Sequence, residues 1–239
     1  MREAILAAMP ILVWVLAALN LFLLILIFKE YGKNKYNKLP FLMGVLAFGL
    51  FYDSLIIALG IVMPEGGFFK AISQIRFVLH GFLIPLIIPI SAMALRLKPK
   101  ALKTVWLATL VLMLVGLISG ICVNTEARTV GGIIRYASSA QTPGWAEAVQ
   151  NGLSYVTVFL IIIAGAVVLI KEKTPHFLLA GFFMLAFTIL GIFLGKSPDG
   201  DRTKSLMFFI SMFGETLMTL FFLLFHKKRA KADRRINER

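Results

Sequence analysis

Long runs of hydrophobic residues alternate with short polar connections along almost all of the 239-residue chain. A helix needs roughly 20 mostly apolar residues to cross the hydrocarbon core of a bilayer. The stretches that meet this length lie near residues 4–28, 39–63, 72–95, 102–123, 152–170, 176–195 and 205–225. The pattern therefore predicts an all-α integral membrane protein, a single bundle of seven transmembrane helices over residues 1–225.

Composition and charge placement add an orientation to this prediction. The chain is 59% hydrophobic with a mean hydropathy of +0.87, whereas soluble domains are nearer half apolar. Of the 25 Lys and Arg residues, 17 fall on one set of alternating connections and seven on the other. Because connections rich in Lys and Arg stay in the cytoplasm, we expect the N-terminus outside the cell membrane and the C-terminus in the cytoplasm.

The remaining segment, residues 226–239, is a strongly basic tail with the sequence HKKRAKADRRINER. Basic residues beside a membrane attract anionic lipid, and we favour that interpretation over nucleic-acid binding for the net charge of +13. A membrane or cytoplasmic protein partner and a homo-oligomer stay open as alternatives.

Two outer connections and one interrupted span stand out. Residues 64–71, PEGGFFKA, have the Gly and Pro content of a turn or small hairpin. Residues 124–151 form the one long connection, which we expect to hold a short amphipathic helix around Trp145 or to be a flexible surface loop. Pro85 and Pro89 lie inside the third span and predict a kink there.

Ionisable residues inside the predicted spans are the candidates for function, because a charge in hydrocarbon is expensive. Asp53 lies in the second span, Arg76 and His80 in the third, and Glu215 in the seventh. At 1.5 Å of rise per residue, Asp53, His80 and Glu215 fall within several Å of one depth, with Arg76 about one turn nearer the outside. We therefore predict one cluster in the outer half of the bundle.

Two interpretations of this cluster stay open. It is either a buried ion-pair network that fixes helix register, or a ligand-binding or proton-relay site in which His80 titrates. Three scattered His residues and the single Cys122 give no metal-ligand spacing, so no metal is expected. Enzyme motifs such as a phosphate-binding Gly-rich loop, HExxH or GxSxG are absent.

The chain resembles the microbial (type 1) rhodopsins, mostly in its first three spans. LAFGLFYDSLIIALG carries Tyr52 and Ser54 on the Y-x-S pattern of that family's second helix. PEGGFF follows where the family has a small hairpin, and Arg76 and Pro85 have the spacing of the Arg and Pro on its third helix. GIFLGKSPDG is similar to the end of its sixth helix. The resemblance implies a seven-helix bundle and makes Tyr52 and Ser54 further site candidates.

The departures from that family concern its chemistry. Its members hold retinal on a lysine midway along helix 7, but the seventh span here contains no lysine, and that position falls near Phe213 or Glu215. Lys204 lies at the start of the seventh span, too early in the sequence to take the place of the retinal-binding lysine. Leu79 and Ile90 occupy the positions of the family's counterion and proton donor. No covalent cofactor is therefore expected; a lipid, a carotenoid or another apolar molecule is the candidate non-covalent ligand.

Three functions follow as hypotheses. The first is a rhodopsin-like membrane protein without covalent retinal that acts as a receptor, an accessory protein or a binder of an apolar ligand. The second is a proton- or ion-coupled transporter that uses His80 and the membrane carboxylates. The third is an intramembrane lipid-modifying enzyme, although the missing motifs favour a protein that is not an enzyme.

Overall fold

The computed structural model describes residues 2–194 and 205–237 of the chain. In this part of the chain, seven helical segments are long and apolar enough to cross a membrane. The elements are α1 (Arg2–Lys33), α2 (Lys38–Leu59), α3 (Gly67–Leu83), α4 (Ile87–Ala94), α5 (Pro99–Ile121), β1 (Thr125–Val130), β2 (Ile133–Ser138), α6 (Gly144–Glu172), α7 (His176–Leu194) and α8 (Met207–Asn237). The architecture is that of a multi-pass membrane protein.

The third membrane-length segment, Gly67–Ala94, is interrupted at the prolines that predicted its kink. A short 3-10 turn, Ile84–Leu86, separates α3 from α4 and contains Pro85. Proline lacks an N–H and clashes with the carbonyl four residues before it, so the regular α-helical pattern cannot continue. The prediction of a kink is confirmed.

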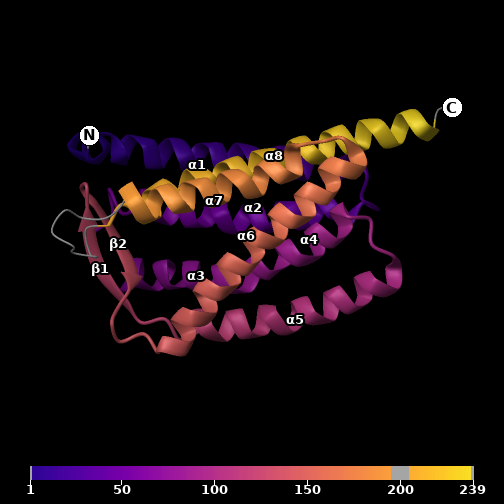
Figure 1. Cartoon of the computed structure of the whole chain (residues 1–239). Helices are drawn as coiled ribbons and strands as arrows, with labels where there is room; N and C mark the ends of the chain where they lie inside the picture. Colours follow the sequence, from indigo (N-terminus) through magenta and orange to yellow (C-terminus); the bar gives the residue numbers. More distant parts are fainter. Residues whose placement is uncertain (1, 195–204, 238–239) are drawn as a thin grey trace.

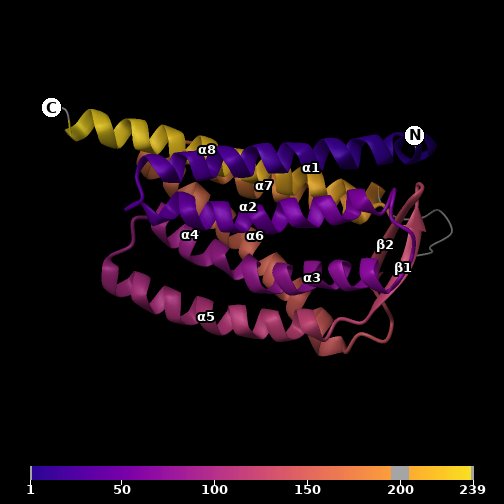
Figure 2. The same ribbon diagram turned by 180° about the vertical axis from the view of Figure 1, so that it is seen from behind.

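The helices run along one long axis between two ends, and the chain termini lie at opposite ends (Figure 1). We call the end with the N-terminus and the β1–β2 hairpin the hairpin end. The other, where α8 extends beyond its neighbours, we call the basic end, because its connections and the basic segment at the end of the chain together hold most of the Lys and Arg residues. Seen from behind, α1 and α2 lie side by side and α5 forms the outer margin (Figure 2).

Glycines set the closest approach in the bundle, between α3 and α5. A methyl group on Gly81 of α3 would overlap the carbonyl of Gly116 on α5, and one on Gly120 would overlap the Phe77 carbonyl. Gly116 and Gly120 are four apart, so they lie on one face of α5. This is the small-residue spacing that lets membrane helices touch backbone to backbone, and it fixes α3, with its polar side chains, against α5.

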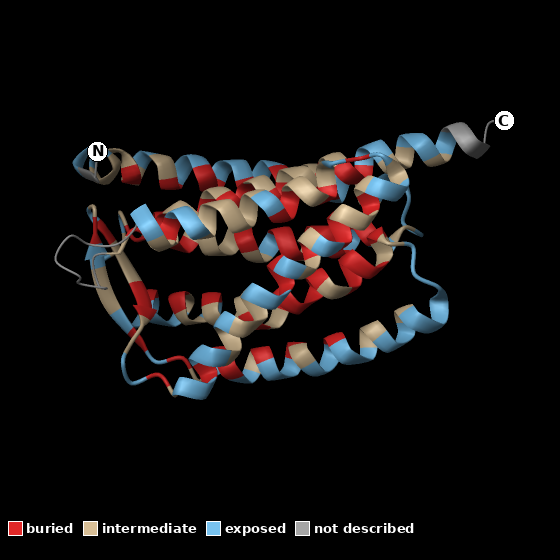
Figure 3. Cartoon of the chain, in the orientation of Figure 1, coloured by how far each residue is buried: buried red, intermediate tan, exposed pale blue. Residues whose placement is uncertain are grey.

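The outward faces of the helices are apolar, as lipid contact requires. On α5 the exposed large side chains include Leu107, Leu110, Leu114 and Ile118. Buried residues lie on the inward faces, while the outer face of α5 is exposed (Figure 3). A cluster of buried apolar side chains, including Leu46, Ile87, Val168 and Phe222, fills the basic half of the bundle.

The long connection after α5 differs from both predictions made for it. Residues 125–138 form an antiparallel hairpin in which Val130 pairs with Ile133. Gly131 and Gly132 turn the chain with φ of +57° and +76°, the left-handed conformations that a two-residue hairpin turn requires. The predicted short helix around Trp145 is instead the first turn of α6, which begins at Gly144.

The hairpin is attached to the helices below it. Ile134 N donates to Gly60 O at 2.9 Å, and Gly66 N donates to the Tyr136 hydroxyl at 3.1 Å. Residues 64–66 therefore form a turn that holds the hairpin, and Gly67 begins α3. At the basic end, most of the segment predicted as a tail continues α8 as far as Asn237.

Candidate functional site

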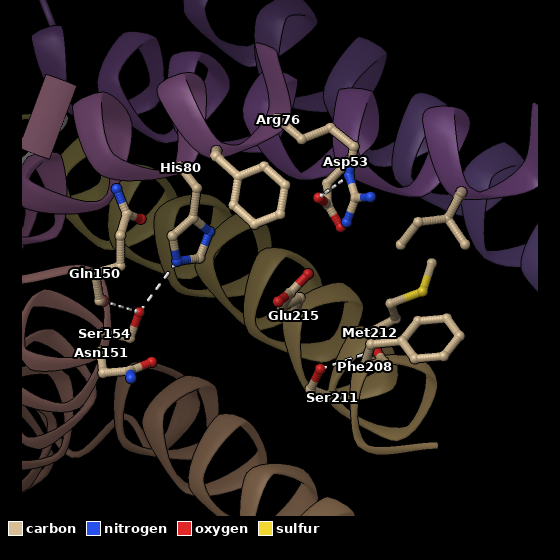
Figure 4. A pocket seen from close by; sticks show the side chains of 12 residues that line it. Asp53, Arg76, His80, Gln150, Asn151, Ser154, Phe208, Ser211, Met212 and Glu215 are labelled. Carbon is tan, nitrogen blue, oxygen red and sulfur yellow. Dashed lines mark hydrogen bonds and ion pairs between the residues drawn. The ribbon is translucent and has the colours of Figure 1, made fainter. Parts of the chain in front are cut away.

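One pocket in the hairpin half of the bundle, with a cavity volume of about 230 Å³, brings together all four ionisable residues of the predicted cluster. α2, α3, α6 and α8 supply its walls (Figure 4). The lining residues are Asp53, Ile57, Arg76, Phe77, His80, Gln150, Asn151, Ser154, Phe208, Ser211, Met212 and Glu215. We call this cavity the polar pocket, because eight of these twelve residues have polar or ionisable side chains.

Asp53 and Arg76 form an ion pair across α2 and α3. The Arg76 Nε donates to the Asp53 Oδ1 at 2.7 Å, with side-chain exposures of 9% for Arg76 and 24% for Asp53. The Arg76 Nη1 is buried without a hydrogen-bond partner among the described residues. The pair joins the two helices, and Asp53 keeps acceptor capacity toward the cavity because a carboxylate has two oxygens.

His80 is oriented by α6. Its Nε2 lies 3.1 Å from the Ser154 Oγ, and the Ser154 hydroxyl donates to the Gln150 carbonyl at 3.0 Å. A hydroxyl has one proton to donate, so the Ser154 Oγ accepts and the His80 Nε2 carries the proton in this contact. A neutral His80 then presents Nδ1 as an acceptor.

Glu215 points from α8 into the space between His80 and the Asp53–Arg76 pair (Figure 4). Among residues 2–194 and 205–237, no hydrogen bond or ion pair is found for its carboxyl group. One turn earlier on the same helix, Ser211 lines the pocket, and its hydroxyl donates to the Phe208 carbonyl at 2.9 Å. Because its proton is used in that bond, the Ser211 Oγ is left as a further acceptor. The pocket thus presents the acceptors of Glu215 and Ser211 beside the unpartnered Nη1 donor of Arg76.

Two residues show where the pocket meets its surroundings. Asn151 of α6 lines the pocket and is exposed, so the pocket reaches the surface of the bundle there. Arg135 of β2 stands outside the lining, with its guanidinium 3.9 Å from the centre of the Phe208 ring. Burial lowers the pKa of Arg135, and the nearby Arg76 charge acts in the same direction. An arginine begins from a pKa so high that it stays cationic at neutral pH.

Several lining residues were not singled out from the sequence as site candidates. Gln150 and Asn151 fall in what the hydropathy pattern assigns to the long connection, whereas α6 already includes them. Gln150 Nε2 donates to the Ser119 Oγ at 2.9 Å, which ties α6 to α5 beside the pocket. Their adjacent amide side chains, shortly before the apolar run, were the available signal.

The two candidates taken from the rhodopsin resemblance lie outside the pocket lining. The Tyr52 hydroxyl donates to the Ile72 carbonyl at 2.9 Å. Ser54 is buried and accepts from the Asn20 side-chain amide at 3.2 Å. Both side chains therefore connect neighbouring helices. Lys204 and most of the turn in GIFLGKSPDG lie outside the described residues.

Metal and family comparisons add no identification. No group of three or more His, Cys, Asp or Glu side chains that could hold a metal ion occurs within the part of the chain that the structure describes. Comparison of the chain with protein-family models and with curated proteins finds no match. The resemblance to microbial rhodopsins therefore stays a prediction. Fold and site together define a class, a seven-helix membrane-type bundle with a polar pocket in its hairpin half.

Proposed function

We propose that this chain is a ligand-binding membrane protein, a receptor or accessory protein without covalent retinal, and that its polar pocket binds a small organic ammonium compound. The proposal places the hairpin end outside the cell membrane and the basic end in the cytoplasm, as the distribution of Lys and Arg favours. The proposal includes a rhodopsin-like arrangement of the seven helices, four of which contribute residues to the pocket.

The unpaired Glu215 carboxyl carries this proposal. Asp53 is already paired with Arg76 at 2.7 Å, while Glu215 has no partner among the described residues and faces the same cavity. A ligand with a charged N–H group satisfies both Glu215 and the neutral His80 Nδ1. Phe77 and Phe208 in the lining add aromatic faces, which attract cations.

The polar lining changes the class of ligand from the one the sequence suggested. A lipid tail or carotenoid needs a chamber walled by hydrocarbon, because polar groups without partners are costly to cover. Only four lining residues, Ile57, Phe77, Phe208 and Met212, are apolar. This composition supports a compact polar ligand with a small apolar part.

The position of the apolar core favours binding over transport. On each helix that lines the pocket, residues of the buried apolar cluster follow within about two turns toward the basic end; they include Leu50, Leu83, Ile161 and Met218. The buried Thr157 and Thr216 lie before them, and each donates to a backbone carbonyl of its own helix. Hydrocarbon packing of this kind offers no chain of polar groups to carry a proton or ion onward. Ion-coupled transport through His80, and lipid chemistry at this site, stay as alternatives without such support.

We expect Glu215→Gln to weaken ligand binding at least about tenfold, since it removes a charged hydrogen bond without changing side-chain size. The measurement is thermal stabilisation of the purified protein by a panel of primary and secondary amines, each paired with its neutral alcohol. Mass spectrometry of molecules that co-purify with the protein extends the panel without bias.

Glu147→Gln is the matched control, because Glu147 is an exposed acid near the start of α6 that does not line the pocket. It should leave stabilisation by amines unchanged. Equal stabilisation by amines and their alcohols, or equal losses in the two variants, would contradict the proposed ligand class.

The proposed orientation predicts opposite labelling of two engineered cysteines in a Cys122→Ser background. Thr129→Cys is exposed on the hairpin, and Tyr36→Cys is at a position 97% exposed in the α1–α2 connection at the basic end. A membrane-impermeant maleimide added to intact cells should label Thr129→Cys, and should label Tyr36→Cys only after permeabilisation. The reverse pattern would invert the bundle in the membrane.

A further inference from the structure

A second polar cavity lies at the basic end, far along the bundle from the polar pocket. It has a volume of about 200 Å³ and is lined by Asn37, Leu39, Met93, Arg96, His226, Arg229, Ala230 and Asp233. These residues come from the start of α2, the end of α4 with the connection after it, and α8. We call this cavity the basic-end pocket.

Two arginines of this pocket share two carboxylates. Arg96 Nε lies 3.1 Å from the Glu172 Oε1, and Arg96 Nη2 lies 2.9 Å from the Asp233 Oδ1. Arg229 Nη2 lies 3.0 Å from the same Glu172 oxygen, and Arg229 Nη1 donates to the Met93 carbonyl at 3.1 Å. The Arg229 side chain is only 10% exposed, so it is held inside the bundle. The Arg96 side chain is 57% exposed and is the part of the network that a ligand can reach.

His226 provides an observation independent of this network. It is 94% buried, lines the basic-end pocket, and has no hydrogen bond with any described residue. Among the described residues, some buried polar atoms are fully enclosed and have no partner, but the His226 ring nitrogens do not belong to them. The His226 ring therefore keeps some exposure where it lines the cavity, and a ligand there can accept a proton from it.

The backbone of α2 adds a third contribution to the same cavity. Asn37 caps α2 by accepting from Leu39 N at 3.1 Å, so the first turn of the helix opens on the pocket. The N-terminus of a helix carries partial positive charge. Asn37 engages Leu39 N and Pro40 has no N–H, so the Lys38 N is the first-turn donor outside the cap. Lys33, Lys35, Lys38 and Lys98 lie in or beside the connections at the same end, and such a field concentrates anions.

We propose that the basic-end pocket binds a phosphate group, held by Arg96, His226 and the first turn of α2. Asp233 is the group that yields. Its carboxylate is paired with the Arg96 guanidinium in this structure, and its side chain is 47% exposed. When phosphate binds Arg96 instead, the Asp233 side chain turns into solvent. A phosphate monoester in its singly charged form replaces one carboxylate in this exchange, so the charge on Arg96 stays balanced. A planar guanidinium binds both groups through paired hydrogen bonds.

The test uses the full-length protein in detergent, with retained lipid measured by native mass spectrometry. The probes are phosphatidic acid and phosphatidylcholine, with inorganic phosphate and glycerol 1-phosphate tested separately by thermal stabilisation. Arg96→Gln should reduce retention of phosphatidic acid about tenfold, the equivalent of about 1.4 kcal/mol. Asp233→Asn should increase retention, because it removes the competitor for Arg96.

Lys100→Gln is the control, because it removes one positive charge from an exposed position at the same end, outside the pocket. It should leave retention unchanged, and stabilisation by inorganic phosphate alone would identify a soluble ligand instead of a lipid headgroup. Equal losses in Arg96→Gln and Lys100→Gln would overturn the proposal, since they would indicate attraction by net charge only. A failure here leaves the ammonium site untouched, because the two pockets share no residue.

Discussion

Gly116→Ala should destabilise the bundle by about 3 kcal/mol, the upper end of the cost of overpacking a tightly packed site. The added methyl group would overlap the carbonyl and Cα of Gly81 on α3. Neither helix backbone can rotate away as a side chain would, so α3 and α5 must separate along their contact. The measurement is the midpoint of unfolding in mixed micelles with increasing dodecyl sulfate.

Gly152→Ala is the matched control on α6. A methyl group there meets nothing within 4 Å, and alanine is the better helix former. We expect its unfolding midpoint to stay the same or to rise. If Gly116→Ala were equally neutral, α3 and α5 would be able to separate without loss, and the backbone contact would not hold them.

Arg76→Gln should cost about 3 kcal/mol of stability, because it leaves Asp53 as an uncompensated charge in a partly buried site. We take the lower end of the range for such pairs, since the Asp53 side chain keeps 24% exposure through the cavity. Dodecyl sulfate unfolding at neutral pH measures the loss.

The double variant Asp53→Asn/Arg76→Gln should recover much of that loss, since two neutral amides can hydrogen-bond where two charges were paired. A double-mutant cycle with both single variants isolates the coupling between the two side chains. Additive effects of the two substitutions would contradict a direct ion pair and would leave register control to the apolar packing.

The seven spans could be predicted because a bilayer sets a length that the hydropathy pattern must match. The interruption at Pro85 could also be predicted from the sequence, because a proline removes a backbone hydrogen-bond donor from any helix that contains it. The convergence of Asp53, Arg76, His80 and Glu215 on one cavity followed from counting depth along straight helices, since few charges lie inside the spans. Their role in binding stays a prediction.

The hairpin was missed because its signal is weak beside seven apolar runs. TEARTV and IIRYAS are six-residue strands joined by Gly131 and Gly132, a pattern that predicts a two-residue turn. Neither strand alternates cleanly between polar and apolar residues, because β2 packs Tyr136 on the helices and holds Arg135 beside Phe208. The start of α6 was placed late for a related reason. Its first two turns, GWAEAVQN, mix polar and apolar residues and are less hydrophobic than the rest of the helix.

The glycine contacts also join the helices of the bundle into two closely packed pairs. Gly116 and Gly120 lock α5 to α3, and Gly191 and Gly214 bring α7 close to α8. The polar pocket takes walls from α3 of one pair and from α8 of the other, so we expect a ligand that widens or narrows it to tilt one pair against the other. From Glu215 to the end of α8 is about 33 Å of helix, and a tilt of ~5° displaces that end by ~3 Å. By this geometry, a ligand that binds near Glu215 would move the basic segment at the far end of α8.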